Sequence, residues 1–492
     1  MKRLLCLLLT VLMVLSAAAC TARIPQAAEQ NNDQPERKPE TTIEVTVPPA
    51  AEPEPTIEIT EPAEPEPSTE PTSPDEPVES PAPLFPIEDP PIQPGQPIDP
   101  PIDLTDPVQP IYSPDGKKPE VNGYADFSNL LSAALLSGTE NRNLSPISVY
   151  LALAMVTEGA EGDTQDELLT LLGCKDLAEL RGVCGAMLAQ FSIDEERSTL
   201  DIHNSLWMAD EINGAPVAFK DAFLTSLAAN YGSKANTVRF GSQPAKLQIA
   251  AWITEHTRGK IKISPDALEF DPSTLAVLIN TIYLKDSWSE TFDPERTETD
   301  TFFGYDGETT ADYMHRFDKN SVVRQGDGWI AYRVYLARIG WVTFVLPDEG
   351  VELSKLLGSP EAIDKLLHQG IEKNFDVSLM IPKFKFQDKM ELTRILQSLG
   401  LELSFTPAAD FSGMSDLPAC INSVLQESYI GVDENGVEAA AYTMISVKTT
   451  AFNPVELEKI EFHLTRPFFY AIESRDGTVL FIGTVTNPGA GE

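Results

Sequence analysis

Cysteine is scarce in this sequence. Five cysteines occur in 492 residues, and two of them, Cys6 and Cys20, lie at the apolar N-terminal run. The other three, Cys174, Cys184 and Cys420, are odd in number and include no CxxC pair. This pattern excludes a disulfide framework and argues against a cysteine-based zinc site. Buried free thiols are the prediction, and a single bridge between two of the three stays open.

Histidine and catalytic motifs are also scarce. The sequence has no HExxH, GxSxG or phosphate-loop motif. Each histidine is therefore predicted to be structural or at the surface, and this applies to His203, His256, His315, His368 and His463. Nothing in the sequence supports an enzyme, a metal site or a bound cofactor.

Positive charge is in short supply. Lysine and arginine total 36 against 75 acidic residues, which gives a formal net charge of -39. Binding to phosphate or to an anionic membrane surface requires a basic face, so this balance argues against both. We expect no nucleic-acid partner, and solubility is the plain interpretation of the charge.

The N-terminus has the features of a targeting segment. Lys2 and Arg3 precede the apolar run LLCLLLTVLMVL, which is short for a membrane span. The sequence SAAAC that follows resembles the lipobox of bacterial lipoproteins, although a leucine is usual where Ala17 stands. We expect residues 1–19 to be a signal peptide and Cys20 to carry lipid on the outer face of a bacterial cell membrane. A secretory peptide cut near Ala19 is the alternative.

A proline-rich and acidic stretch follows. Residues 21–120 contain 26 of the 40 prolines, with 22 acidic residues against 5 basic ones. Prolines remove backbone donors and like charges repel, so such a stretch cannot form a packed core. Residues 20–120 are therefore predicted to be a disordered, lipid-anchored spacer that holds a domain away from the membrane.

The composition changes near Val121. Apolar residues recur at helical spacing in residues 125–138, 149–160 and 165–174. Strand-like runs follow at 275–285, 341–347, 377–386, 459–464 and 479–488. Helices early and strands late predict one α+β domain over residues 121–492, with large, mostly antiparallel sheets.

One segment of this domain is unusual. From Val437 to about Glu456 the periodicity is weak, and a stretch of that length without structure is usually functional. Up to Val447 it has no proline, no glycine and one charge, Glu438. Alternate residues are mostly apolar and suit the buried face of a strand: Val437, Ala439, Ala441, Thr443 and Ile445. We expect an exposed loop in one state and a strand in another; a permanent strand or short helix is the alternative.

The segment resembles the hinge of a serpin, a serine protease inhibitor. The residues that match the hinge pattern are Glu434, Gly436, Val437, Glu438, Ala439, Ala440 and Ala441. Other family motifs occur in order over residues 121–488, including NLSPIS, WITEHTRGKI, LINTIYLKDSWSETFDPERT and RPFFYAIESRDGTVLFIGTVTNP. Two departures are Gln426, where the family often has histidine, and Tyr442, which interrupts the alanine run.

The resemblance implies a fold, a site and a mechanism. The fold is that of serpins, with helices packed on large sheets and an exposed reactive-centre loop. The sheet-opening region would contain Asn143, Ser145, Pro146, Ser148, Asn280, Trp288 and Gln426. A serine protease would cut the loop and remain attached as an acyl-enzyme while the loop inserts into a sheet. The inhibitor would be a monomer that contributes no catalytic residue.

The family's loop length implies the position of the cut. About fourteen residues past Gly436 lies the bond Thr450–Ala451, and a small residue before the bond suits elastase-like proteases. Lys448 would suit a trypsin-like enzyme and Phe452 a chymotrypsin-like one. The alternative function is a non-inhibitory serpin-fold module for binding or adhesion at the cell surface.

Overall fold

The computed structural model describes residues 120–195, 197–437 and 457–489. The predicted signal peptide, Cys20, nearly all of the spacer, Glu438, Ala439–Ala441 and the Thr450–Ala451 bond lie outside these residues. Within the described part, no helix has the length and hydropathy needed to cross a membrane.

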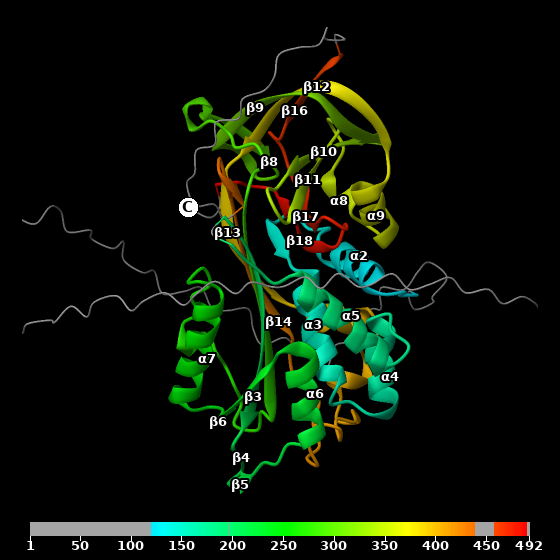
Figure 1. The fold of residues 1–492 in the computed structure, drawn as a ribbon, viewed down its shortest axis with the longest axis vertical. Helices are drawn as coiled ribbons and strands as arrows, with labels where there is room; N and C mark the ends of the chain where they lie inside the picture. The colour runs from blue at the N-terminus through cyan, green and yellow to red at the C-terminus, as the bar shows by residue number, and fades with distance from the viewer. Residues whose placement is uncertain (1–119, 196, 438–456, 490–492) are drawn as a thin grey trace, which may run out of the picture. The chain divides into compact units, whose positions relative to one another are not determined.

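Helices dominate the first part of the domain, as the periodicity predicted (Figure 1). Several begin at recognisable signals: α5 is capped by the side chain of Asp176, and α7 by that of Ser242 with a proline in its first turn. The helices are α2 (Tyr124–Leu135), α3 (Pro146–Thr157), α4 (Gly162–Leu171), α5 (Leu177–Gln190), α6 (Asp221–Tyr231), α7 (Gln243–His256), α8 (Leu353–Leu356), α9 (Pro360–His368) and α10 (Thr393–Ser398).

A nine-stranded sheet has the strand order β1-β18-β17-β11-β10-β9-β12-β16, with β8 paired to β9. All of its ladders are antiparallel except β12 with β16. Its strands are β1 (Arg142–Leu144), β8 (Glu298–Gly304), β9 (Gly307–Gly326), β10 (Trp329–Tyr335), β11 (Gly340–Pro347), β12 (Ile371–Pro382), β16 (Lys459–His463), β17 (Phe468–Ser474) and β18 (Val479–Val485).

A seven-stranded sheet carries the segment of interest. Its order is β13-β14-β15-β7-β3-β2, with β6 parallel to β3. The strands are β2 (Ile193–Glu195), β3 (Ser198–Ala209), β6 (Lys234–Val238), β7 (Ala276–Ser287), β13 (Phe384–Glu391), β14 (Leu425–Asp433) and β15 (Gly436–Val437). A separate hairpin pairs β4 (Glu211–Ile212) with β5 (Ala215–Pro216).

Both faces of the seven-stranded sheet are covered. On one face, Ile249 and Ile253 of α7 pack in a cluster with Val277 and Ile279 of β7. On the other face, Leu284 of β7 joins the main core. Alternate residues of β7 therefore point into two different clusters, as the two-residue period of a strand requires.

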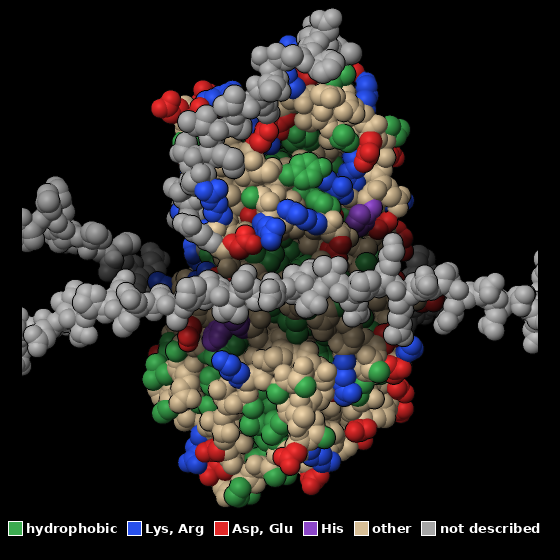
Figure 2. All heavy atoms as spheres, in the orientation of Figure 1, with side chains coloured by type: hydrophobic (Ala, Val, Ile, Leu, Met, Phe, Trp, Pro, Cys, Tyr) green, Lys and Arg blue, Asp and Glu red, His purple; other side chains and the backbone are tan. Residues whose placement is uncertain are grey.

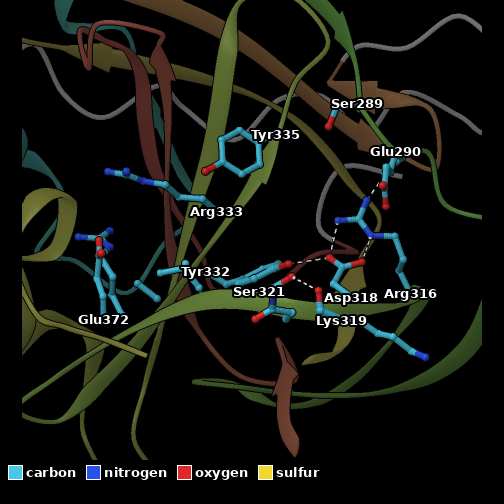
Figure 3. A pocket seen from close by; sticks show the side chains of 14 residues that line it. Ser289, Glu290, Arg316, Asp318, Lys319, Ser321, Tyr332, Arg333, Tyr335 and Glu372 are labelled. Carbon is cyan, nitrogen blue, oxygen red and sulfur yellow. Dashed lines mark hydrogen bonds and ion pairs between the residues drawn. The ribbon is translucent and has the colours of Figure 1, made fainter. Parts of the chain in front are cut away.

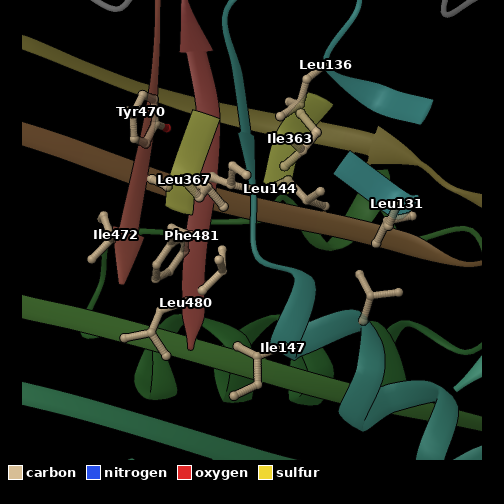
Figure 4. Packing of buried hydrophobic residues seen from close by; sticks show 14 of the residues in the cluster. Leu131, Leu136, Leu144, Ile147, Ile363, Leu367, Tyr470, Ile472, Leu480 and Phe481 are labelled. Atoms are coloured by element: carbon tan, nitrogen blue, oxygen red, sulfur yellow. The ribbon is translucent and has the colours of Figure 1, made fainter. Parts of the chain in front are cut away.

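The main core lies where β17 and β18 meet helices α2, α3 and α9. Both strands are buried at all seven positions. Figure 4 shows Ile472 of β17 and Leu480 and Phe481 of β18 packed near Ile147 of α3 and Leu367 of α9. The architecture confirms the predicted α+β class.

The three cysteines of the domain are unpaired. Cys174 and Cys184 are buried, and the Tyr150 hydroxyl lies 3.4 Å from the Cys174 sulfur. Cys420 is exposed, so the prediction of a buried thiol was wrong there. Cys420 lies in a segment without helix or strand. Its neighbours Ala419 and Ile421 pack against the core and are themselves only partly buried.

Candidate functional site

The predicted hinge begins as a strand. Gly436 and Val437 form β15, which pairs with β14 through Val437–Val432 and with β7 through Val437–Asp286. A side chain at position 436 would place its Cβ 2.1 Å from the Asp286 carbonyl oxygen, so only glycine allows this approach. The start of the segment therefore lies between β14 and β7 and pairs with both.

Beyond β15, the two flanking strands have no common partner in the described residues. There β7 pairs with β3 on its other side, and β14 pairs with β13. The facing backbone edges run from Ala276 to Lys285 on β7 and from Leu425 to Gly431 on β14. Among the described residues these two edges have no ladder to each other, and such an edge is a template for a further strand.

Trp288 holds the turn that leads into β15. Its indole Nε1 donates to the Asp433 carbonyl and its backbone N–H donates to the Asn435 carbonyl, each at 2.8 Å. The ring is fully buried and packs edge-to-face on Phe292. The Phe292 N–H adds a hydrogen bond to the Glu434 carbonyl at 2.9 Å.

Glu434 is held by its side chain as well. Its Oε1 accepts from the Thr297 hydroxyl at 2.8 Å and lies 3.2 Å from the Lys383 ammonium. Burial alone would raise the pKa of this carboxyl, but hydrogen bonds from its own backbone and Thr297, with the charge of Lys383, hold the pKa below its ordinary value. Lys383 was not predicted, because the partner of Glu434 lies 51 positions away in the chain, in the strand-like run 377–386.

The Glu434–Lys383 pair gives a stability prediction. In Lys383→Met the mostly buried carboxylate loses its counter-ion, so we expect a loss of about 1–3 kcal/mol at neutral pH. The lowered pKa means that this stabilisation is present above the ordinary pKa of 4.5 and disappears as the pH falls through the lowered value. The half-life of the folded protein on heating, measured at pH 7 and in acid, checks this.

Lys385→Met is the matched control because Lys385 lies exposed on the neighbouring strand β13. Equal half-lives for the two variants at pH 7 would contradict the assignment of the ion pair.

Gln426 fastens β14 to the start of α3. Its Oε1 accepts from the Ser145 N–H at 3.1 Å and its Nε2 donates to the Ser145 carbonyl at 2.8 Å. Ser145 also donates its hydroxyl to the Leu480 carbonyl at 2.9 Å, and Pro146 begins the helix. The glutamine therefore ties β14 to the residue that precedes α3.

Asn143 belongs to the same cluster. Its Nδ2 donates to the Ser428 hydroxyl at 3.0 Å, its Oδ1 accepts from the Tyr470 hydroxyl at 2.9 Å, and its N–H donates to Asp388 at 2.9 Å. The sequence analysis did not identify these three partners. Ser428 was detectable, because it is a polar residue two positions from Gln426 on the buried face of a strand.

Asn280 does not join this cluster. It lies on β7, where its Nδ2 donates to Asn204 at 2.8 Å. Its Oδ1 is buried and has no hydrogen-bond partner among the described residues. The grouping predicted from the sequence is thus divided: Asn143, Ser145 and Gln426 are joined on the β14 side, Asn280 lies on the β7 side, and Trp288 lies at the end. Ser148 is buried within α3.

The histidines form no catalytic arrangement in the described residues. His256 bonds the Trp252 carbonyl at 2.8 Å and packs against His203, while His463 lies 3.1 Å from the Ser378 hydroxyl. In the same residues, no three His, Cys, Asp or Glu side chains lie together as a metal ion would require.

Comparison with known proteins identifies the family. The family model described as serpin, serine protease inhibitor, matches residues 122–488. A serpin-like protein of Thermococcus kodakarensis is 30% identical over 383 residues, which are 76% of this chain and 87% of that protein. Serpin-Z2B of Triticum aestivum is 28% identical and covers 74% of this chain and 94% of its own length. The chain belongs to the serpin family.

Solved structures agree with this assignment. The thermophilic serpin Tengpin in its native state matches with a TM-score of 0.65 at 27% identity, over 75% of this chain and 96% of its own. Thyroxine-binding globulin in complex with thyroxine matches with a TM-score of 0.63 at 23% identity, over 74% of this chain and 98% of its own. The second likeness shows the shared fold alone.

Proposed function

We propose that this protein inhibits serine proteases by inserting its cleaved loop between β7 and β14. The observation that carries this proposal is the position of β15, which pairs with both of those strands. If the register of Val437 continues, Ala439 comes opposite Leu284 of β7 and Ile430 of β14. Both of these side chains lie in the main core, so Ala439 would point into it, and Ala441 would follow two residues later.

The same register supports a place for Thr443. It comes opposite Asn280 on one side and Gln426 on the other. The buried Asn280 Oδ1 has no donor among the described residues, and a threonine hydroxyl supplies one. A buried acceptor without a partner destabilises the folded state, so insertion would remove an unfavourable feature of the sheet.

Insertion also explains how a protein without a catalytic site stops an enzyme. The protease serine attacks the Thr450 carbonyl, Ala451 leaves as a new amino terminus, and an ester joins the loop to the protease. The freed loop then adds to the sheet as a strand and carries the attached protease with it. Distortion of the protease before water hydrolyses the ester makes the trap permanent, with native-state strain as the driving force.

Trapping of an elastase-like protease tests the function. We expect a complex that survives SDS, because the small Thr450 side chain suits a narrow specificity pocket. Mass spectrometry should find a released C-terminal fragment that begins at Ala451. A fragment that begins at Thr449 or Asn453 would instead indicate a trypsin-like or chymotrypsin-like target. A protein that forms no complex with any serine protease would be a binding or adhesion module.

We also propose that the inhibitor acts as a monomer at the cell surface, anchored through Cys20 and held out by the spacer. The basis is the SAAAC motif followed by the proline-rich acidic stretch. Cys20→Ser should move the protein from the membrane fraction to the soluble or secreted fraction, as an immunoblot of fractionated cells would show. Cys6→Ser, inside the apolar run, is the matched control and should stay at the membrane. Retention of both variants at the membrane would refute the anchor.

A further inference from the structure

A hollow of about 510 Å³ opens between β9, β10 and the start of β12 (Figure 3). Its lining also includes Ser289 and Glu290, which follow β7 in the chain. A volume of this size is enough for one small organic ligand. None of its side chains has a part in the loop insertion described above.

The hollow has a small excess of positive charge although the protein is strongly acidic. Its lining includes Arg316, Lys319, Arg324 and Arg333 against three carboxylates, those of Glu290, Asp318 and Glu372. Figure 2 shows lysine and arginine side chains grouped around hydrophobic ones on the upper half of this face. The lining carboxylate of Asp318 is already occupied, because it accepts two hydrogen bonds from Arg316 at 2.7 and 2.8 Å and one from the Tyr332 hydroxyl.

Two of the arginines lie close together at the end of α9. Arg324, which is 4% exposed, donates to the Leu366 and Gln369 carbonyls, and Arg333 donates to the Leu367 carbonyl. Burial, together with the neighbouring charge of Arg333, lowers the pKa of Arg324 to about 10. Carbonyl groups satisfy the donors, and the carboxylates of Glu473 and Glu372 offset part of the charge.

Part of this charge remains available to a ligand, because the Arg333 side chain is 29% exposed. Its Nε is buried and has no hydrogen-bond partner in the described residues. The carboxylate of Glu473 lies 4.0 Å from Arg333, beyond hydrogen-bonding distance, and Glu372 at the rim also attracts Arg324. Lys319 has no ion pair within 4.0 Å among the described residues.

Two apolar side chains lie exposed at the rim of the hollow. Tyr335 is 57% exposed and Val322 is 47% exposed, and both line the hollow. Aromatic faces stack on flat ligands, and guanidinium groups bind carboxylates and sulfonates with paired hydrogen bonds. We propose that this hollow binds a small organic anion with a flat apolar body, of the aromatic carboxylate or sulfonate class.

Calorimetric titration of the full-length protein with naphthalene-2-sulfonate tests the site. We expect one binding site per chain, weaker binding of inorganic sulfate, and a fall in affinity as salt is added. Lys319→Gln and Tyr335→Ala should each weaken binding about three- to tenfold. Both positions leave the hydrogen bonds at the end of α9 in place, so neither variant is expected to unfold.

Lys365→Gln is the matched control. It removes the same charge from a position on α9 outside the hollow, so its affinity should equal that of the parent. The proposal is overturned if naphthalene-2-sulfonate does not bind, or if Lys319→Gln and Tyr335→Ala bind it as tightly as Lys365→Gln does. Trapping of proteases is a separate assay, so failure here would leave the proposed function standing.

Discussion

Ala439→Arg is expected to turn the protein from an inhibitor into a substrate. If the register of β15 continues on insertion, position 439 comes opposite Leu284, which is 6% exposed, and Ile430, which is 3% exposed. A guanidinium inserted there would be a buried charge without a partner, which costs several kcal/mol. The variant should therefore still be cut at Thr450–Ala451 but release active protease.

The size of the effect follows from a competition between two rates. Insertion must be completed before water hydrolyses the acyl-enzyme, and each 1.4 kcal/mol added to the insertion barrier slows it about tenfold. We therefore expect the number of inhibitor molecules consumed for each protease inactivated to rise by at least about tenfold. Titration of a fixed amount of protease with each variant measures this number directly.

Ala440→Arg is the matched control. In the same continued register, position 440 would come opposite Tyr283 and Tyr429, on the other face of the sheet. Arg258 and Lys260 already lie over these two rings, and the Arg258 side chain is 43% exposed. Charged side chains therefore already reach water on this face, and an inserted arginine can do the same, so this variant should keep much of its inhibition. Equal inhibition by the two variants and the parent would mean that the loop does not insert in this register.

The strand period and the resemblance to serpins each contributed part of the predicted site. The two-residue period of a strand, which depends on sequence position alone, separates Ala439 from Ala440. The resemblance to serpins added the hinge and the position of Trp288. The observed pairing of Val437 with Asp286 and Val432 gives the register at the start of the segment, which periodicity alone leaves open.

The polar contacts were not predictable in the same way. Lys383 pairs with Glu434 and Asp388 bonds the Asn143 N–H, yet local periodicity says nothing about partners that lie far apart in the chain. Asn280 and Gln426 were grouped together but lie on opposite flanks of the site. Their distance depends on whether a strand lies between them. The sequence is the same with and without that strand, so it does not fix the distance.

Strand β9 shows a second limit. It runs over 20 residues, Gly307–Gly326, and was not among the predicted strands. Few of its residues are both apolar and buried: Ala311, Tyr313, Met314 and Val323. Its long ladder with β12 instead depends on backbone hydrogen bonds, which leave no trace in the pattern of side chains. The hollow beside this strand was missed for the same reason.

Cleavage of the loop is expected to lengthen the life of the folded protein on heating. Before cleavage, the edges Ala276–Lys285 of β7 and Leu425–Gly431 of β14 have no ladder to each other among the described residues. An inserted strand pairs with both edges at once. Each new hydrogen bond contributes about 0.5–1.5 kcal/mol, and the alternate apolar residues of the loop become buried.

The expected change is large because these contributions act together on a strand of about ten residues. A gain of only about 3 kcal/mol in the unfolding barrier lengthens the half-life about a hundredfold, and cutting an ordinary surface loop leaves it unchanged or shorter. Unfolding of such a protein need not be reversible, so the half-life at a fixed high temperature is the proper measure. Protein cut at Thr450–Ala451 should survive incubation that inactivates uncut protein.

The cut Ala439→Arg variant is the matched control. Its loop has the same cut, but insertion would bury the arginine charge, so its half-life should rise far less. If cut and uncut parent protein decay at the same rate, the loop does not enter the sheet and the trap cannot operate.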